Sequence, residues 1–127
     1  MLGTVHTVLV AVPTVQEAMV KDTECVIAWT TLPADGDAVA FARTLVEEHL
    51  AACVSTYPHV ESVYRWRGKM EQACEQVLLI KTTIARLERL RERVCQLHPD
   101  EVPEFLVVPV INGNTSYLNW IIESTTS

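Results

Sequence analysis

"ACVSTYPHVESVYRWRGKMEQACEQVLLIKTT", residues 52–83, predicts a long β-hairpin at the centre of the chain. Its first half, 52–67, is rich in the β-branched and aromatic residues that favour strands. Pro58 interrupts this half, and because proline has no N–H to donate to a ladder, it indicates an edge strand or a bulge. The run "RGKM" supplies a glycine turn, and residues 71–83 return as the antiparallel partner strand.

The segment before this hairpin combines one strand with one helix. Residues 25–32 read "CVIAWTTL", which has strand composition and is followed by a proline and a turn-rich run. Asp37 is expected to cap a helix that runs through residue 50. The apolar positions of this helix recur at three- and four-residue spacing, and His49 is expected on the same stripe.

The segment after the hairpin repeats the pattern in the opposite order. Residues 84–97 predict a helix with an apolar stripe, and Thr83 is its expected cap. Residues 102–111 predict a fourth strand, and "SYLNWIIES" a short closing helix. The resulting order of strand, helix, strand, strand, helix, strand predicts an α+β fold, the ferredoxin-like βαββαβ sandwich with a long hairpin between its second and third strands.

Two helices can cover only one face of such a sheet. Yet the predicted strands are apolar at consecutive positions, in "CVIAW", "VLLI" and "FLVVPVI". An uncovered apolar face of this kind exceeds the patch of roughly a few hundred Å² that a monomer tolerates. We therefore expect self-association, with Leu79 or Val107 at a shared centre. The rival explanation is that residues 1–24 fold over the same face.

Length and charge limit the possible classes of protein. The 127 residues fit one domain, expected at 25–127, after an extension at 1–24 in which Met19 is an alternative start. With 49% hydrophobic residues, the composition is that of a soluble globular protein. A net charge of -6 argues against a nucleic-acid partner, since phosphates require a basic stripe. No run approaches the ~20 apolar residues of a membrane helix, so no membrane contact is expected.

The four cysteines are Cys25, Cys53, Cys74 and Cys95. No two of them form a C-x-x-C pair, so neither a zinc knuckle nor a thioredoxin-like redox motif is indicated. We expect ordinary buried thiols in a reducing cytoplasm, because a chain of this length can build a core without disulfides.

Five motifs in one order carry a family resemblance: "LAACV", "SVYRWRGK", "IKTT", "HPDEVPE" and "GNTSYLNW". Through them, residues 25–122 resemble the CutA family of divalent-cation tolerance proteins. The resemblance implies a homotrimer of ferredoxin-like subunits whose hairpins reach a neighbour, no catalytic activity, and a role in tolerance to divalent ions, with copper binding in some members. Animal relatives are associated with anchoring acetylcholinesterase, so a protein-anchoring module is an alternative.

The copper set attributed to some relatives is mostly absent. Thr30 stands where they have a strand-one cysteine, Leu97 where they have a second histidine, and Asp100 where an aromatic is common. Of that set His98 alone matches.

His98 has two interpretations. It stands at a predicted helix end before a proline, where imidazole interacts favourably with the helix dipole. It is also followed by Glu101 and Glu104, whose carboxylates could join the imidazole around copper or another divalent ion. Folding is not expected to require this ion. Cys53 is a further candidate for a soft metal, against a simpler role as a small buried hydrophobe.

Four residues suggest a cleft between subunits that could take a small ligand, although the pair of Lys81 and Glu104 among them could instead simply fix strand register. Lys81 is a charge inside an apolar strand and needs a partner, for which Glu104 is the candidate. Tyr64 and Trp66, near the hairpin tip, are expected to pack on a neighbouring subunit, since aromatic residues are enriched in interface cores.

An enzyme is disfavoured, because no nucleophile-elbow, Walker or zincin motif gathers the polar residues. The main rival function is a PII-like small-metabolite sensor, which shares the trimeric plan. Such a sensor needs a long mobile loop and backbone groups that cradle phosphates, whereas this hairpin turns tightly at "RGK".

Overall fold

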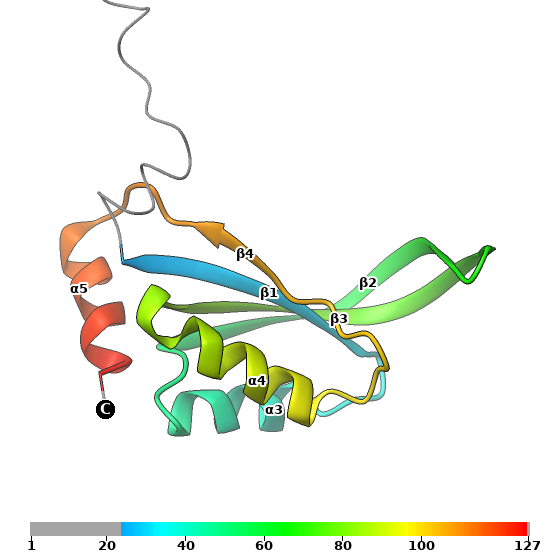
Figure 1. Ribbon diagram of the computed structural model, residues 1–127, viewed down its shortest axis with the longest axis horizontal. Helices are drawn as coiled ribbons and strands as arrows, with labels where there is room; N and C mark the ends of the chain where they lie inside the picture. Colours follow the sequence, from blue (N-terminus) through cyan, green and yellow to red (C-terminus); the bar gives the residue numbers. More distant parts are fainter. Residues whose placement is uncertain (1–23, 127) are drawn as a thin grey trace, which may run out of the picture.

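The computed structural model describes residues 24–126 and contains one four-stranded sheet with helices on one side (Figure 1). In chain order the elements are β1 (Cys25–Pro33), α3 (Ala38–Glu47), β2 (Cys53–Trp66), β3 (Lys69–Thr83), the short 3₁₀ helix η1 (Ile84–Arg86), α4 (Leu87–Leu97), β4 (Leu106–Pro109) and α5 (Thr115–Ser124). Within the described residues, no helix has the length and apolar character needed to cross a membrane.

The strand order is β2-β3-β1-β4, and every neighbouring pair is antiparallel. This is the arrangement of the split βαβ units, so the predicted ferredoxin-like α+β fold is confirmed. The fourth strand is shorter than the predicted 102–111. Pro103 cannot donate to a ladder, and the carbonyl of Glu104 instead accepts a hydrogen bond of 2.6 Å from the Thr30 hydroxyl.

The hydrophobic core lies between the sheet and helices α3 and α4, which cover the same face (Figure 1). Alternate residues of each strand point into it, as the two-residue period of a strand requires. Its fully buried large side chains come from both layers and include Leu45, Leu78, Ile80, Leu90 and Val94.

The opposite face of the sheet carries large apolar side chains that this chain leaves exposed. Trp29 is 39% exposed, Leu106 62% and Val108 46%. Leu79 pairs with Trp29 across β1 and β3 and lies outside the helix-covered core, whereas Val107 packs against that core. The expectation of an uncovered apolar face is therefore confirmed, and Leu79 rather than Val107 belongs to it. The suggested cover, residues 1–24, lies outside the described residues apart from its last position.

The hairpin of β2 and β3 is closed by a two-residue turn. Arg67 and Gly68 both have positive φ, 51° and 80°, between the paired residues Trp66 and Lys69. These values fit a type I′ turn, whose twist matches that of the flanking strands. The register of the hairpin shifts between Tyr57 and Val60, so the bulge predicted from the intervening proline is confirmed.

The start of α4 differs from the prediction. The Thr83 hydroxyl makes no capping hydrogen bond and instead lies 3.5 Å from the hydroxyl of Thr125, beyond the end of α5. The chain enters α4 through η1, and the Arg86 side chain donates to the Thr125 carbonyl. The closing helix α5 is confirmed, and the Asn114 side chain caps it. Docking of α5 therefore uses the threonine that local sequence had suggested as a cap.

Helix α3 ends earlier than predicted, and His49 leaves its apolar stripe. The N–H of Leu50 donates to the Leu45 carbonyl and the N–H of His49 to the Val46 carbonyl, which is the Schellman pattern. His49 therefore occupies the left-handed position, with φ 59°, where glycine is usual. Its ring nitrogen Nδ1 lies 3.3 Å from the Ser124 carbonyl oxygen.

His49→Gly is expected to unfold at higher denaturant concentration than His49→Ala. Both variants lose the imidazole, and only glycine relieves the left-handed strain, worth about 1 kcal/mol. Urea unfolding at one protein concentration measures the difference. Equal midpoints would show that the helix end carries no strain at this position.

Candidate functional site

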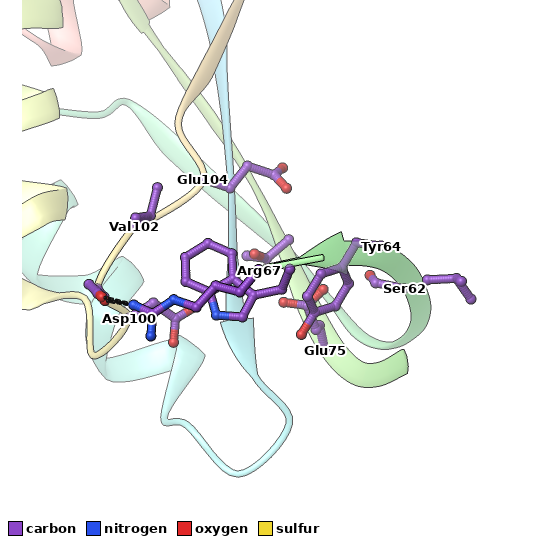
Figure 2. Close-up of a pocket in the computed structure, with 11 residues that line it drawn as sticks. Ser62, Tyr64, Arg67, Glu75, Asp100, Val102 and Glu104 are labelled. Atoms are coloured by element: carbon purple, nitrogen blue, oxygen red, sulfur yellow. Dashed lines mark hydrogen bonds and ion pairs between the residues drawn. The ribbon is translucent and has the colours of Figure 1, made fainter. Parts of the chain in front are cut away.

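A pocket of about 660 Å³ lies between the β2–β3 hairpin and the segment that joins α4 to β4 (Figure 2). The hairpin contributes residues of β2 together with Glu75 of β3 and its turn, and the joining segment contributes mostly acidic residues. The lining residues on which its chemistry depends are Tyr64, Trp66, Arg67, Glu75, Glu101 and Glu104.

Arg67 ties the hairpin tip to the joining segment. Its terminal nitrogen lies 2.7 Å from both carboxylate oxygens of Glu101. Its guanidinium also lies 5.2 Å from the ring centroid of Trp66, within the range of a cation–π contact. Figure 2 shows the Arg67 side chain lying between the hairpin and the segment that carries Asp100. The turn conformation of Arg67 thus directs its side chain into the pocket, where it is the one basic residue of the lining.

The pocket as a whole is acidic. Asp100, Glu101, Glu75 and Glu104 line it against the single guanidinium. Burial raises the pKa of the Glu104 carboxyl above its ordinary value, and the neighbouring charge of Glu75 raises it further. An additional negative charge is therefore unfavourable here, so the pocket suits a cation or a neutral ligand better than a phosphate.

Three of the four residues predicted for a cleft meet in this pocket, namely Tyr64, Trp66 and Glu104. Lys81 does not join them, and the expected pairing with Glu104 is absent within the chain. The Lys81 amine instead donates to the Tyr117 hydroxyl at 3.3 Å, which is the main reason that its pKa is raised. Local sequence could not reveal this partner, because Tyr117 is brought in by α5.

His98 is buried at the end of α4, and both of its ring nitrogens are engaged. Nε2 faces the Thr31 carbonyl oxygen at hydrogen-bond distance, so it donates, and Nδ1 accepts from the backbone N–H of Asp100 at 3.0 Å. One donor and one acceptor describe a neutral imidazole with no free lone pair for a metal ion. His98 stands at the end of α4, as the first interpretation expected, but its ring binds the Thr31 carbonyl of β1 and the Asp100 N–H and so fastens the helix end to β1.

The predicted metal ligands His98, Cys53, Glu101 and Glu104 are not gathered into one group within the chain. Cys53 lies opposite Lys81 in the hairpin ladder, far along β2 from the pocket. Among the described residues, the one such group of three is His59, Glu61 and Cys74.

Sequence reasoning missed this group. His59 and Glu61 are two residues apart on a strand, which was a visible signal, but the position of Cys74 depends on the register of the hairpin. The expectation of four buried thiols was also too general: Cys25 is buried, Cys53 and Cys74 are half-buried, and Cys95 is exposed. All four are free of disulfides.

Comparison with known proteins identifies the family. A model described as "CutA1 divalent ion tolerance protein" matches residues 26–124. The chain belongs to the CutA family. The "Divalent-cation tolerance protein CutA" of Thermus thermophilus is 45% identical over 95 residues, which cover 75% of this chain and 92% of the relative. "Protein CutA" of Homo sapiens is 40% identical over 100 residues, or 79% of this chain, and the match spans 56% of the human protein.

Solved CutA structures share the fold. The Thermus thermophilus protein superposes with a TM-score of 0.77 at 42% identity, over 80% of this chain and 99% of the other. A protein described as "PII-like protein CutA" from Nostoc superposes with a TM-score of 0.74 at 40% identity, over 80% of this chain and 97% of the other. The CutA family is described by a tolerance function, and its description names no reaction.

Glu104→Gln is expected to stabilise the protein near neutral pH. A carboxyl whose pKa is higher in the folded than in the unfolded state binds more protons when the chain is folded. The free energy of unfolding therefore falls as pH rises from the ordinary pKa of the carboxyl through its raised pKa. The glutamine variant lacks this loss. Its advantage over wild type should be present near neutral pH and vanish below about pH 4.

Denaturant unfolding across this pH range measures the effect. Glu101→Gln is the matched control in the same segment, because it breaks the pair with Arg67 and should lower stability near neutral pH. A glutamine advantage that grows on acidification would contradict the raised pKa of Glu104.

Proposed function

We propose that the protein acts as a homotrimer in tolerance to divalent metal ions, without catalytic turnover, in a reducing cytoplasm. The observation that supports assembly is the uncovered face of the sheet, where Trp29, Leu106 and Val108 are exposed. Helices α3 and α4 pack on the other face and cannot cover it. The family described as divalent ion tolerance proteins supplies the role. The absence of a disulfide among the described cysteines fits the proposed compartment.

Self-association is the simplest way to bury this face. The side chains of Leu79 and Trp29 are paired in the middle of it, and β4 continues it with Leu106. Burial of such side chains yields roughly 25 cal/mol per Å² of apolar surface, which favours a closed oligomer over an exposed patch. α5 adds Tyr117 and Trp120, each 41% exposed, near one end of the sheet.

Leu79→Asp is expected to dissociate the oligomer while the chain stays folded. It places an unpaired charge in a dry interface, at a cost of several kcal/mol. Sedimentation and circular dichroism measure assembly and folding. Val107→Asp should instead unfold the chain, because Val107 packs against the helix-covered core.

Val39→Asp, on the outer side of α3 where Val39 is 61% exposed, is the control and should leave assembly intact. A wild-type chain that stays monomeric at micromolar concentration would refute the proposed homotrimer.

The proposed tolerance role includes weak, direct contact with a divalent ion, copper among them. The ion is held by side chains other than His98, whose nitrogens are occupied by Thr31 and Asp100. Of the two carboxylates predicted as metal ligands, Glu101 is paired with Arg67. Glu104 has no ion-pair partner among the described residues.

His98→Ala is expected to lower the free energy of unfolding by about 1–3 kcal/mol, because it leaves the buried Thr31 carbonyl and the Asp100 N–H without their partner. Its affinity for divalent copper should equal that of wild type. Titration calorimetry on trimer-checked samples measures the affinity. Loss of copper binding in a folded His98→Ala trimer would return His98 to the site.

A PII-like metabolite sensor is the second candidate, favoured by the description of the Nostoc structure. Two features of this chain weigh against it. The hairpin closes in two residues, Arg67 and Gly68, and so offers no long loop. The pocket beside it holds four carboxylates and one guanidinium, which repels the phosphates of a nucleotide.

A further inference from the structure

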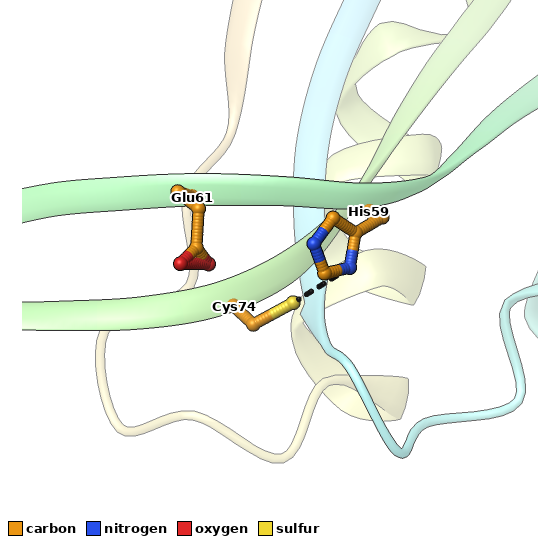
Figure 3. Close-up of side chains that lie close together, drawn as sticks. All are labelled: His59, Glu61 and Cys74. Atoms are coloured by element: carbon orange, nitrogen blue, oxygen red, sulfur yellow. Dashed lines mark hydrogen bonds between the residues drawn. The ribbon is translucent and has the colours of Figure 1, made fainter.

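Three side chains of different chemistry meet on one face of the hairpin (Figure 3). Glu61 of β2 and Cys74 of β3 are direct partners across the ladder, so their side chains share a face. His59 stands two residues before Glu61 on the same strand and therefore also shares this face. The pocket residues Ser62 and Tyr64 alternate with Glu61 along β2 and point to the opposite face.

His59 lies in the irregular segment of β2, next to Pro58. Between the pairs Tyr57 with Val77 and Val60 with Glu75, two residues of β2 lie opposite one residue of β3. Such an extra residue bends the strand and re-aims side chains. In this segment the Nδ1 atom of His59 lies 3.2 Å from the Sγ atom of Cys74, although these residues are not paired in the ladder.

The spacing of the donor atoms is close to that of a tetrahedral metal site. One atom from each of His59, Glu61 and Cys74 lies within 4.8 Å of the other two. Metal–ligand bonds of about 2.0–2.3 Å at tetrahedral angles place ligand atoms roughly 3.3–3.6 Å apart. The sulfur and nitrogen are already near this distance. The Glu61 side chain is exposed and has the rotatable bonds needed to complete it.

We propose that His59, Glu61 and Cys74 form a binding site for a borderline divalent cation of the zinc class, with water as the fourth ligand. Thiolate, imidazole and carboxylate are the three ligand types that zinc takes in proteins, and calcium or magnesium would select oxygen ligands alone. His59 and Glu61 are exposed and Cys74 is half-buried, so the ion can enter without a change in the fold.

Two other roles fit the group less well. A disulfide has no second partner in the cluster, since Cys74 is its one cysteine. An activated nucleophile requires a stabilised thiolate, whereas desolvation and the charges of Glu61 and Glu75 raise the pKa of the Cys74 thiol. A bound cation compensates the negative charge of these carboxylates.

This proposal deepens the preceding one, since it rests on direct contact with a divalent ion and names the ligands. Cobalt(II) is the probe, because a cobalt–thiolate bond absorbs in the near ultraviolet and a tetrahedral cobalt ion absorbs in the visible. The full chain is titrated with cobalt(II) under anaerobic conditions with a thiol-free reductant. Zinc is then added to displace the cobalt.

Wild type should show both absorptions at one cobalt ion per chain, and zinc should abolish them. Cys74→Ser should lose the thiolate absorption. His59→Gln should bind cobalt at least about tenfold more weakly, because even the loss of a residue that only supports a metal ligand typically weakens binding about tenfold. Cys95→Ser, which removes an exposed thiol outside the cluster, is the matched control and should behave as wild type.

The site is overturned if Cys74→Ser keeps the thiolate absorption, if His59→Gln binds cobalt as tightly as wild type, or if wild type shows no absorption in excess cobalt. Sedimentation of the same samples and copper calorimetry separate the two proposals. A wild-type trimer that binds copper but gives no cobalt–thiolate absorption removes this site alone. A chain that binds no divalent ion removes direct contact from the proposed function as well.

Discussion

The pairing of β3 on both of its edges is the constraint on which the rest of the structure depends. Residues 75–83 of β3 pair with β1, while β2 pairs with nearly the whole length of β3. The tip of the hairpin, on the turn side of residue 75, therefore extends past β1 and β4, as Figure 1 shows at the right. Both the acidic pocket and the His59 cluster are built on this extension or where it begins. Its two faces alternate residue by residue, so one strand pair supplies two chemically different surfaces.

Much of the fold could be predicted from sequence, because its signals are local. The strand composition around Pro58, the glycine in "RGK" and the helical stripe through Leu90 each act within a few residues and agree with the final structure. Two of the errors occurred where a distant segment competes for a side chain. Thr83 is an adequate local cap, but Thr125 of the chain end contacts its hydroxyl instead. Lys81 found Tyr117 of α5 instead of the predicted carboxylate, for the same reason.

The candidate site was less predictable than the fold, since its chemistry depends on strand register and on hydrogen-bond partners. Nothing in "HPDEVPE" reveals that the carbonyl of Thr31 will meet one nitrogen of His98 and the N–H of Asp100 the other. The position of Cys74 beside His59 depends on the ladder register counted from the hairpin turn, which pairs Glu61 with Cys74. Family membership, which covers residues 26–124, identifies the fold and the general role and leaves these pairings to the individual chain.

The bulge at Pro58 also bears on the solubility of the molecule. β2 is an outer strand of the sheet, 14 residues long, and a straight outer strand offers its free N–H and C=O groups to any further chain, which can lead to fibrils. Here a proline without an N–H and an extra residue interrupt that row in its first half, and Glu61 and Arg65 charge its second half. Edge-to-edge pairing along β2 is thereby disfavoured. The apolar face of the sheet remains available for the proposed assembly of finite size.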